Sequence, residues 1–125
     1  MTYAYWYVFI AFLMPYLFTL LAKVAAPGFN NAKPREFLEN LDGWRKRSHW
    51  AQLNSFEVFP PFAAGIIIAH QLSAPQAYID MLGLAFLGFR FAYGLMYITN
   101  QALLRSVAFL GSLACIIGLF LVSAH

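Results

Sequence analysis

The chain has 125 residues, of which 62% are hydrophobic and only 10% are charged, and its mean hydropathy is +0.64. About a quarter of the residues of a soluble domain are charged, so this composition excludes a soluble domain and predicts an integral membrane protein. The net charge is +3. Because the cations gather at the ends of apolar stretches, we expect them to contact anionic membrane lipid, not nucleic acid.

Four apolar stretches predict an all-α, four-helix membrane bundle that fills residues 1–125 as a single domain, since each membrane-spanning helix takes about 20 residues. The first stretch contains Pro15, which membrane helices tolerate as a kink. A polar loop is predicted over residues 26–47, with a short interfacial helix from Pro34 to Leu41. The four spans are expected at residues 3–25, 48–72, 76–98 and 103–122.

The positive residues predict the orientation of these helices. Most of them lie in or beside the first loop, Arg105 borders the third loop, and the second loop, near Ser73, has none. Positive residues of short loops stay on the cytoplasmic side. We therefore expect loops one and three in the cytoplasm and both termini outside, across the inner membrane if the source is a bacterium. The cations of the first loop and its flanking helix ends are Lys23, Lys33, Arg35, Arg45, Lys46 and Arg47.

Polar residues in the second span recur on one helical face. Arg47, Asn54 and Glu57 follow one another at intervals of seven and three residues. At about 1.5 Å per residue, Glu57 lies on the order of 13 Å beyond Ser48, within the hydrocarbon. A charged side chain that faces lipid at this depth costs several kcal/mol. We therefore expect Glu57 to face the interior of the protein.

A second polar stripe, formed by Arg90, Tyr93 and Tyr97, follows one face of the third span. Arg90 lies about 11 Å from the Tyr97 end of this span, a depth similar to that of Glu57. We expect Arg90 to face inward and to pair with Glu57, directly or through Asn54. Two interpretations stay open, because such a pair can hold two helices together or can form part of a binding site.

The predicted topology also brings three cations into the same leaflet as these groups. Lys23, Arg47 and Arg105 can bind carboxylates, Tyr93 and Tyr97 can donate hydrogen bonds, and the start of the fourth helix adds partial positive charge. Together they predict a site for a small anionic ligand. Each cation alone also fits a headgroup anchor, and each tyrosine an aromatic belt, so the interpretation depends on their convergence.

We expect no metal site. His49 lies at one end of the predicted bundle and His70 and His125 lie at the other, so the histidines have no metal-ligand spacing. The single cysteine, Cys115, excludes an intramolecular disulfide and fits a small apolar residue.

Two segments resemble signatures of the MAPEG superfamily, the membrane-associated proteins of eicosanoid and glutathione metabolism. Residues 51–60, AQLNSFEVFP, are similar to the second-helix signature, in which Asn54 and Glu57 stand three apart. The resemblance covers nearly the whole chain and is strongest to the small bacterial members. The segment similar to the third-helix signature reads Arg90-x-x-Tyr93-x-x-x-Tyr97, followed by Arg105-Ser106.

The resemblance implies a homotrimer of four-helix subunits that binds glutathione between neighbouring subunits near the cytoplasmic side. It implies a transferase or peroxidase acting on small lipophilic electrophiles, with Arg105 stabilising the glutathione thiolate and Tyr93 and Tyr97 beside it. The glutathione-binding positions that it implies are Lys23, Arg47, Asn54, Glu57, Arg90, Tyr93 and Tyr97.

One position departs from the family pattern. Trp50 stands one helical turn before Asn54, where many glutathione-using members have an arginine. Without this arginine, which could bind a carboxylate of glutathione, the sequence does not decide whether the protein is an enzyme. The alternative is a non-catalytic member that binds a lipid or another anionic small molecule. A third interpretation is an assembly protein whose polar stripes only associate helices, whereas transport is disfavoured because no pair of broken helices is present.

Overall fold

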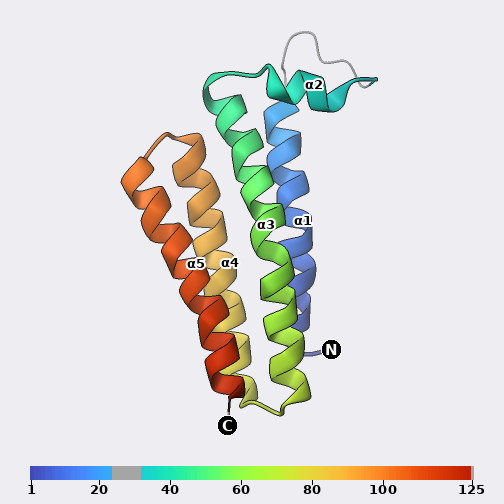
Figure 1. The fold of residues 1–125 in the computed structure, drawn as a ribbon, viewed down its shortest axis with the longest axis vertical. Coiled ribbons are helices and arrows are strands. Elements are labelled where there is room, and N and C mark those ends of the chain that lie inside the picture. The colour runs from blue at the N-terminus through green and yellow to red at the C-terminus, as the bar shows by residue number, and fades with distance from the viewer. Residues whose placement is uncertain (24–31, 125) are drawn as a thin grey trace.

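The computed structural model describes residues 1–23 and 32–124, and this part of the chain is helical apart from its turns and ends. This part of the chain forms four long helices and a short one. The long helices lie side by side, and the short helix lies across one end of them (Figure 1). Three of the long helices, α1, α4 and α5, are long and apolar enough to cross a membrane, which fits the predicted membrane protein. The helices are α1 (Tyr3–Lys23), α2 (Pro34–Glu39), α3 (Gly43–Gln71), α4 (Gln76–Ile98) and α5 (Ala102–Ser123).

The helix boundaries differ from the predicted ranges mainly at the start of α3. The predicted loop over residues 26–47 is too long, because α3 begins at Gly43 and already includes the basic residues before Ser48. Arg and Lys are good helix formers, so the helix extends beyond the apolar stretch that marked it. The short helix α2 forms where it was predicted. The predictions for residues 24–31 and for His125 lie outside the described residues.

Long helices that follow one another in the chain run antiparallel (Figure 1). Helix α1 packs against α3 and α4, and α5 packs against α4 and α3. The α4–α5 turn lies at the same end as α2, whereas both termini and the α3–α4 turn lie at the opposite end (Figure 1). This arrangement places the predicted cytoplasmic elements together, while the side of the membrane that each end faces stays a prediction.

Tight caps close α3 and α4. At the end of α4, the N–H of Asn100 donates to the carbonyl of Tyr97 at 3.1 Å, and the N–H of Gln101 donates to that of Met96 at 2.8 Å. This pair of bonds is a Schellman motif, which needs a residue in the left-handed conformation. Asn100 (φ 62°) supplies it here and Ser73 (φ 57°) supplies it at the end of α3.

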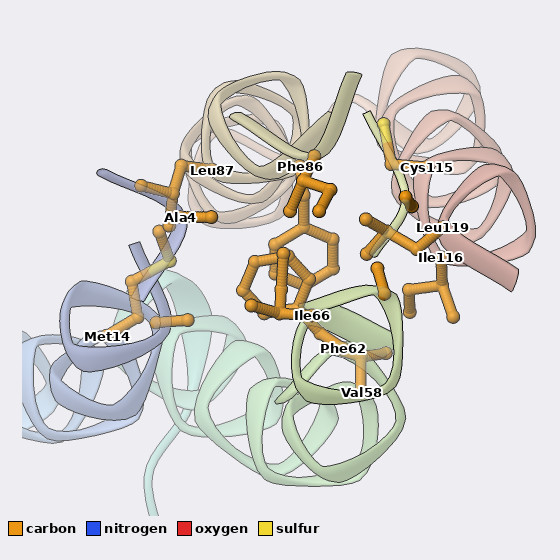
Figure 2. Packing of buried hydrophobic residues seen from close by; sticks show 14 residues of the cluster. Ala4, Met14, Val58, Phe62, Ile66, Phe86, Leu87, Cys115, Ile116 and Leu119 are labelled. Carbon is orange, nitrogen blue, oxygen red and sulfur yellow. The ribbon is translucent and has the colours of Figure 1, made fainter. Parts of the chain in front are cut away.

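The apolar core lies between the long helices (Figure 2). At its centre the rings of Phe62 from α3 and Phe86 from α4 stack, with 3.8 Å between their centroids. Many other large apolar side chains face outward, including Leu110 (63% exposed) and Leu121 (69% exposed) on α5. An apolar outer surface of this extent fits contact with lipid.

The absence of a side chain at Gly94 lets α4 approach α1 closely. A Cβ at Gly94 would overlap the ring of Phe18, which is 4% exposed and has little room to move. Gly88, on the same helix, has no atom within 4 Å of the position of a Cβ. The two glycines therefore separate the effect of packing from the effect of helix propensity.

We expect Gly94→Ala to lower the free energy of unfolding, because overpacking costs about 1–3 kcal/mol and exceeds the gain of about 1 kcal/mol in helix propensity. Gly88→Ala is the control and should leave stability unchanged or raise it by up to about 1 kcal/mol. Thermal unfolding in detergent measures both variants. Equal midpoints for the two variants would contradict the close approach at Phe18.

Candidate functional site

A polar groove opens between α3 and α4, near the end of the molecule that carries α2. Its volume is about 390 Å³. Four of the predicted site residues line it, and two residues that were not predicted to bind ligand, one of them aromatic, complete its wall. The lining residues are Trp50, Leu53, Asn54, Glu57, Tyr93 and Tyr97.

Arg90 lies behind this groove in the interior and is only 1% exposed. Its shortest hydrogen bond runs from Nη2 to Oδ1 of Asn54, at 2.7 Å. Longer bonds of 3.5 Å join Nη2 to the hydroxyl of Ser55 and Nη1 to that of Ser112. The guanidinium thus links α3, α4 and α5 through three neutral oxygen acceptors.

The two serines were missed by the sequence analysis. The hydroxyl of Ser55 donates to the carbonyl of Ala51 at 2.8 Å, and that of Ser112 donates to the carbonyl of Phe109 at 2.7 Å. Because their protons are used on their own helices, their lone pairs are free to accept from Arg90. A hydroxyl in a buried apolar helix needs a partner, and this need is the sequence signal that could have identified them.

Two arginines flank a pair of tyrosine rings at the groove. The Cζ atom of Arg90 lies 4.1 Å from the ring centroid of Tyr93, and the rings of Tyr93 and Tyr97 meet edge to face at 5.5 Å. The Cζ atom of Arg105 lies 4.7 Å from the centroid of Tyr97. These contacts are cation–π and aromatic pairs. They place Arg105, from the first turn of α5, beside Tyr97 of the groove wall.

Glu57 is exposed on the separate chain, so the prediction that it faces the interior is wrong. The buried stripe of α3 instead follows Ser55, Val58 and Phe62, and Glu57 lies on the adjacent face. The predicted link to Arg90 through Asn54 is confirmed, since Nδ2 of Asn54 donates to Oε2 of Glu57 at 3.5 Å. The carboxylate of Glu57 therefore lines the groove, whereas the guanidinium of Arg90 lies in the interior.

Arg47 and Lys23 lie outside the groove wall. The Nε and Nη2 atoms of Arg47 both donate to the carbonyl of Ile98, at 3.1 and 3.0 Å. Arg47 thus ties the start of α3 to the end of α4, and it lines an adjoining groove that also includes Trp50. Lys23 is the last residue of α1 and is not among the lining residues of the α3–α4 groove.

The fold is that of a helical membrane-type protein, with an open, partly polar groove near one end of its helices. The sequence model of the MAPEG family matches residues 3–125, so the chain belongs to the MAPEG family. This match confirms the resemblance found in the two signature segments. No curated protein matches the chain.

We expect Arg47→Gln to loosen the end of α4 even without ligand. A hydrogen bond from a charged donor contributes about 1.5–3 kcal/mol, so amides around residues 98–101 should exchange with deuterium about tenfold faster or more. Arg47→Lys keeps the charge but cannot donate from two nitrogens to one carbonyl, and should show an intermediate rate. Arg45→Gln is the control on the same helix. Unchanged exchange in Arg47→Gln would contradict the capping role.

Proposed function

We propose that the protein is a membrane-bound, glutathione-dependent transferase or peroxidase that acts on lipophilic electrophiles. The observation that carries the proposal is the α3–α4 groove, in which Asn54 and Glu57 face Tyr97 with Arg105 beside it. Membership of the MAPEG family, which is known for glutathione-related functions at membranes, supports it. In this proposal Arg105 and the two groove tyrosines act on the reacting sulfur.

The chemistry follows from the charge of Arg105. A guanidinium near the glutathione thiol favours the thiolate, which is the nucleophile, and the first turn of α5 adds partial positive charge. The phenols of Tyr93 and Tyr97 can donate hydrogen bonds to the thiolate or to the leaving group. The sulfur gives an electron pair to an electrophilic carbon or peroxide oxygen, and the leaving group departs with its bonding pair and is then protonated.

Binding of the peptide part uses the α3 side of the groove. The carboxylate of Glu57 suits the ammonium group of glutathione, and the amide of Asn54 suits a carboxylate or carbonyl oxygen. Glu57 is exposed on a single chain at the expected depth of the hydrocarbon, where a charge that faces lipid is costly. This cost supports an oligomer in which a second copy covers the groove, and we propose the homotrimer that the resemblance to the family implies, with Lys23 reaching ligand from a neighbouring subunit.

The orientation proposed from the loop charges fits this chemistry. The groove residues lie near the start of α3 and the end of α4. This end also carries α2 and the α4–α5 turn (Figure 1), which are expected at the cytoplasmic face. Glutathione maintains the reducing state of the cytosol, so the peptide would enter from that side. The lipophilic substrate would reach the groove laterally from the bilayer.

A second candidate is a non-catalytic member that binds a lipid or another anionic small molecule. The position and exposure of Trp50 favour it, because this side chain is 44% exposed and lines the α3–α4 groove and two adjoining grooves. An apolar ring there offers a contact surface for an acyl chain where a guanidinium would bind a carboxylate.

Glutathione should raise the unfolding midpoint of the purified protein. A ligand that binds only the folded state adds about 2.7 kcal/mol of stability at one hundred times its dissociation constant. We expect Arg105→Ala to lose turnover and to weaken the glutathione effect while it retains the oligomer of the wild type. Thermal unfolding with and without millimolar glutathione, size-exclusion chromatography and a conjugation assay measure these properties.

The control for Arg105→Ala is Arg45→Ala. The Cζ atom of Arg45 lies 4.5 Å from the ring of Trp44, so both variants remove an arginine stacked on an aromatic ring, but Arg45 does not line the groove. Unchanged turnover in Arg105→Ala would reject the role of this residue. Absence of any glutathione effect on the wild type, together with a co-purifying lipid, would favour the second candidate.

Trp50→Arg should distinguish the two candidate functions by a gain of glutathione affinity, in contrast to the loss expected for Arg105→Ala. A new charge-assisted hydrogen bond to a ligand carboxylate contributes about 1.5–3 kcal/mol, so glutathione should bind about tenfold more tightly or better. Isothermal titration calorimetry measures the change. If glutathione affinity stays the same while bound lipid is lost, the groove is a lipid site.

A further inference from the structure

Arg90 cannot contact a ligand in the groove. Its side chain is 1% exposed, and it is absent from the residues that line the groove between α3 and α4. Asn54 does line the groove, and it accepts the shortest hydrogen bond of the guanidinium, at 2.7 Å. Any effect of Arg90 on a bound ligand must therefore pass through a neighbour, and Asn54 is the neighbour in closest contact.

The chemistry of the guanidinium determines which way the Asn54 amide points. Arginine has five N–H donors and no acceptor, so only the oxygen of an amide can face it. The Nδ2 group of Asn54 is thereby directed to the other side, where it donates to Oε2 of Glu57 at 3.5 Å. This contact is long and uses one of two protons, so the amide retains capacity to donate to a ligand.

Rotation of the Asn54 amide would cost much free energy, because Arg90 has few other hydrogen-bond acceptors. Among the described residues no carboxylate bonds directly to Arg90, and its Nε atom has no hydrogen-bond partner. The two serine contacts are each 3.5 Å long. A rotated Asn54 amide would remove the shortest acceptor from a buried cation and place two sets of donors against each other. Buried charges without acceptors are costly, so the rotated form is strongly disfavoured.

We propose that Arg90 is a positioning residue that locks the side-chain amide of Asn54, so that the groove presents an N–H donor next to the Glu57 carboxylate. The locked amide makes the groove selective for ligands that carry a hydrogen-bond acceptor, such as a carboxylate or carbonyl oxygen, close to a donor or cationic group. The proposal rests on the proposed function only in the choice of glutathione as a probe.

The amide itself provides a test without ligand. In protein labelled with ¹⁵N-asparagine, the side-chain signals of Asn54 are assigned by their loss in Asn54→Asp. We expect a pair of proton shifts displaced from those of free asparagine in the wild type and in Arg90→Lys, which keeps a group with donors only. In Arg90→Met both shifts should return toward the values of free asparagine. An unchanged pair in Arg90→Met would overturn the proposal.

Glutathione affinity provides the second test, by titration calorimetry with thermal unfolding in parallel. We expect Arg90→Met to bind about tenfold more weakly than Arg90→Lys, because only lysine can still orient the amide. A packing role alone predicts the reverse order, since methionine suits an apolar interior better than a buried ammonium does. The reverse order would therefore overturn the proposal.

Two further variants separate the amide from the other contacts of Arg90. Asn54→Asp keeps an acceptor for the guanidinium and replaces the donor with a carboxylate oxygen, so glutathione should bind about tenfold more weakly. Ser112→Ala removes a different Arg90 contact and should leave the affinity unchanged. Equal losses in these two variants would overturn the proposal. If the wild type does not bind glutathione, the proposed function fails, and the amide signals still test the role of Arg90.

Discussion

A buried guanidinium that bonds only to neutral oxygens among residues 1–23 and 32–124 constrains this structure more than any other group. Arg90 can be accommodated only where neutral oxygens from two other helices converge on it, and the ring of Tyr93 covers one of its faces. A buried charge that loses its hydrogen-bond acceptors is costly. Sliding or rotation of one of the three helices would remove an acceptor from Arg90 and is therefore disfavoured. The need of Arg90 for hydrogen-bond acceptors thus determines both how α3, α4 and α5 pack and how Asn54 is held in the wall of the groove.

The sequence was sufficient for the helices and for most of the groove, because both follow simple periodicities. The intervals between Asn54 and Glu57 and between Tyr93 and Tyr97 placed these residues on facing helices near one end, where the structure has them. The polar pattern of α3 could not predict the orientation of Glu57. Polar residues occur on the buried face of this helix as well as on the adjacent face, so the pattern did not identify which face points inward. The capping role of Arg47 was also hidden, since it depends on where the partner helix ends.

The position of α3 explains why one helix carries so many different contacts. Its buried stripe packs on the core, its groove face carries Asn54 and Glu57, and its first turns extend beyond the apolar stretch with the basic residues. Its helical register fixes these surfaces relative to one another. A ligand in the groove therefore contacts the same rigid element that holds Arg90 and, through Arg47, the end of α4.

The short turn after α4 determines more than the path of the chain. Only residues 99–101 separate α4 from α5, and the two helices pack against each other. A turn of another length would set the start of α5 at a different distance from the end of α4, and Arg105 would no longer be held at the ring of Tyr97 although every side chain of the groove was still present. Among related chains, the length of this turn is thus as informative about the chemistry of the groove as the presence of the arginine itself.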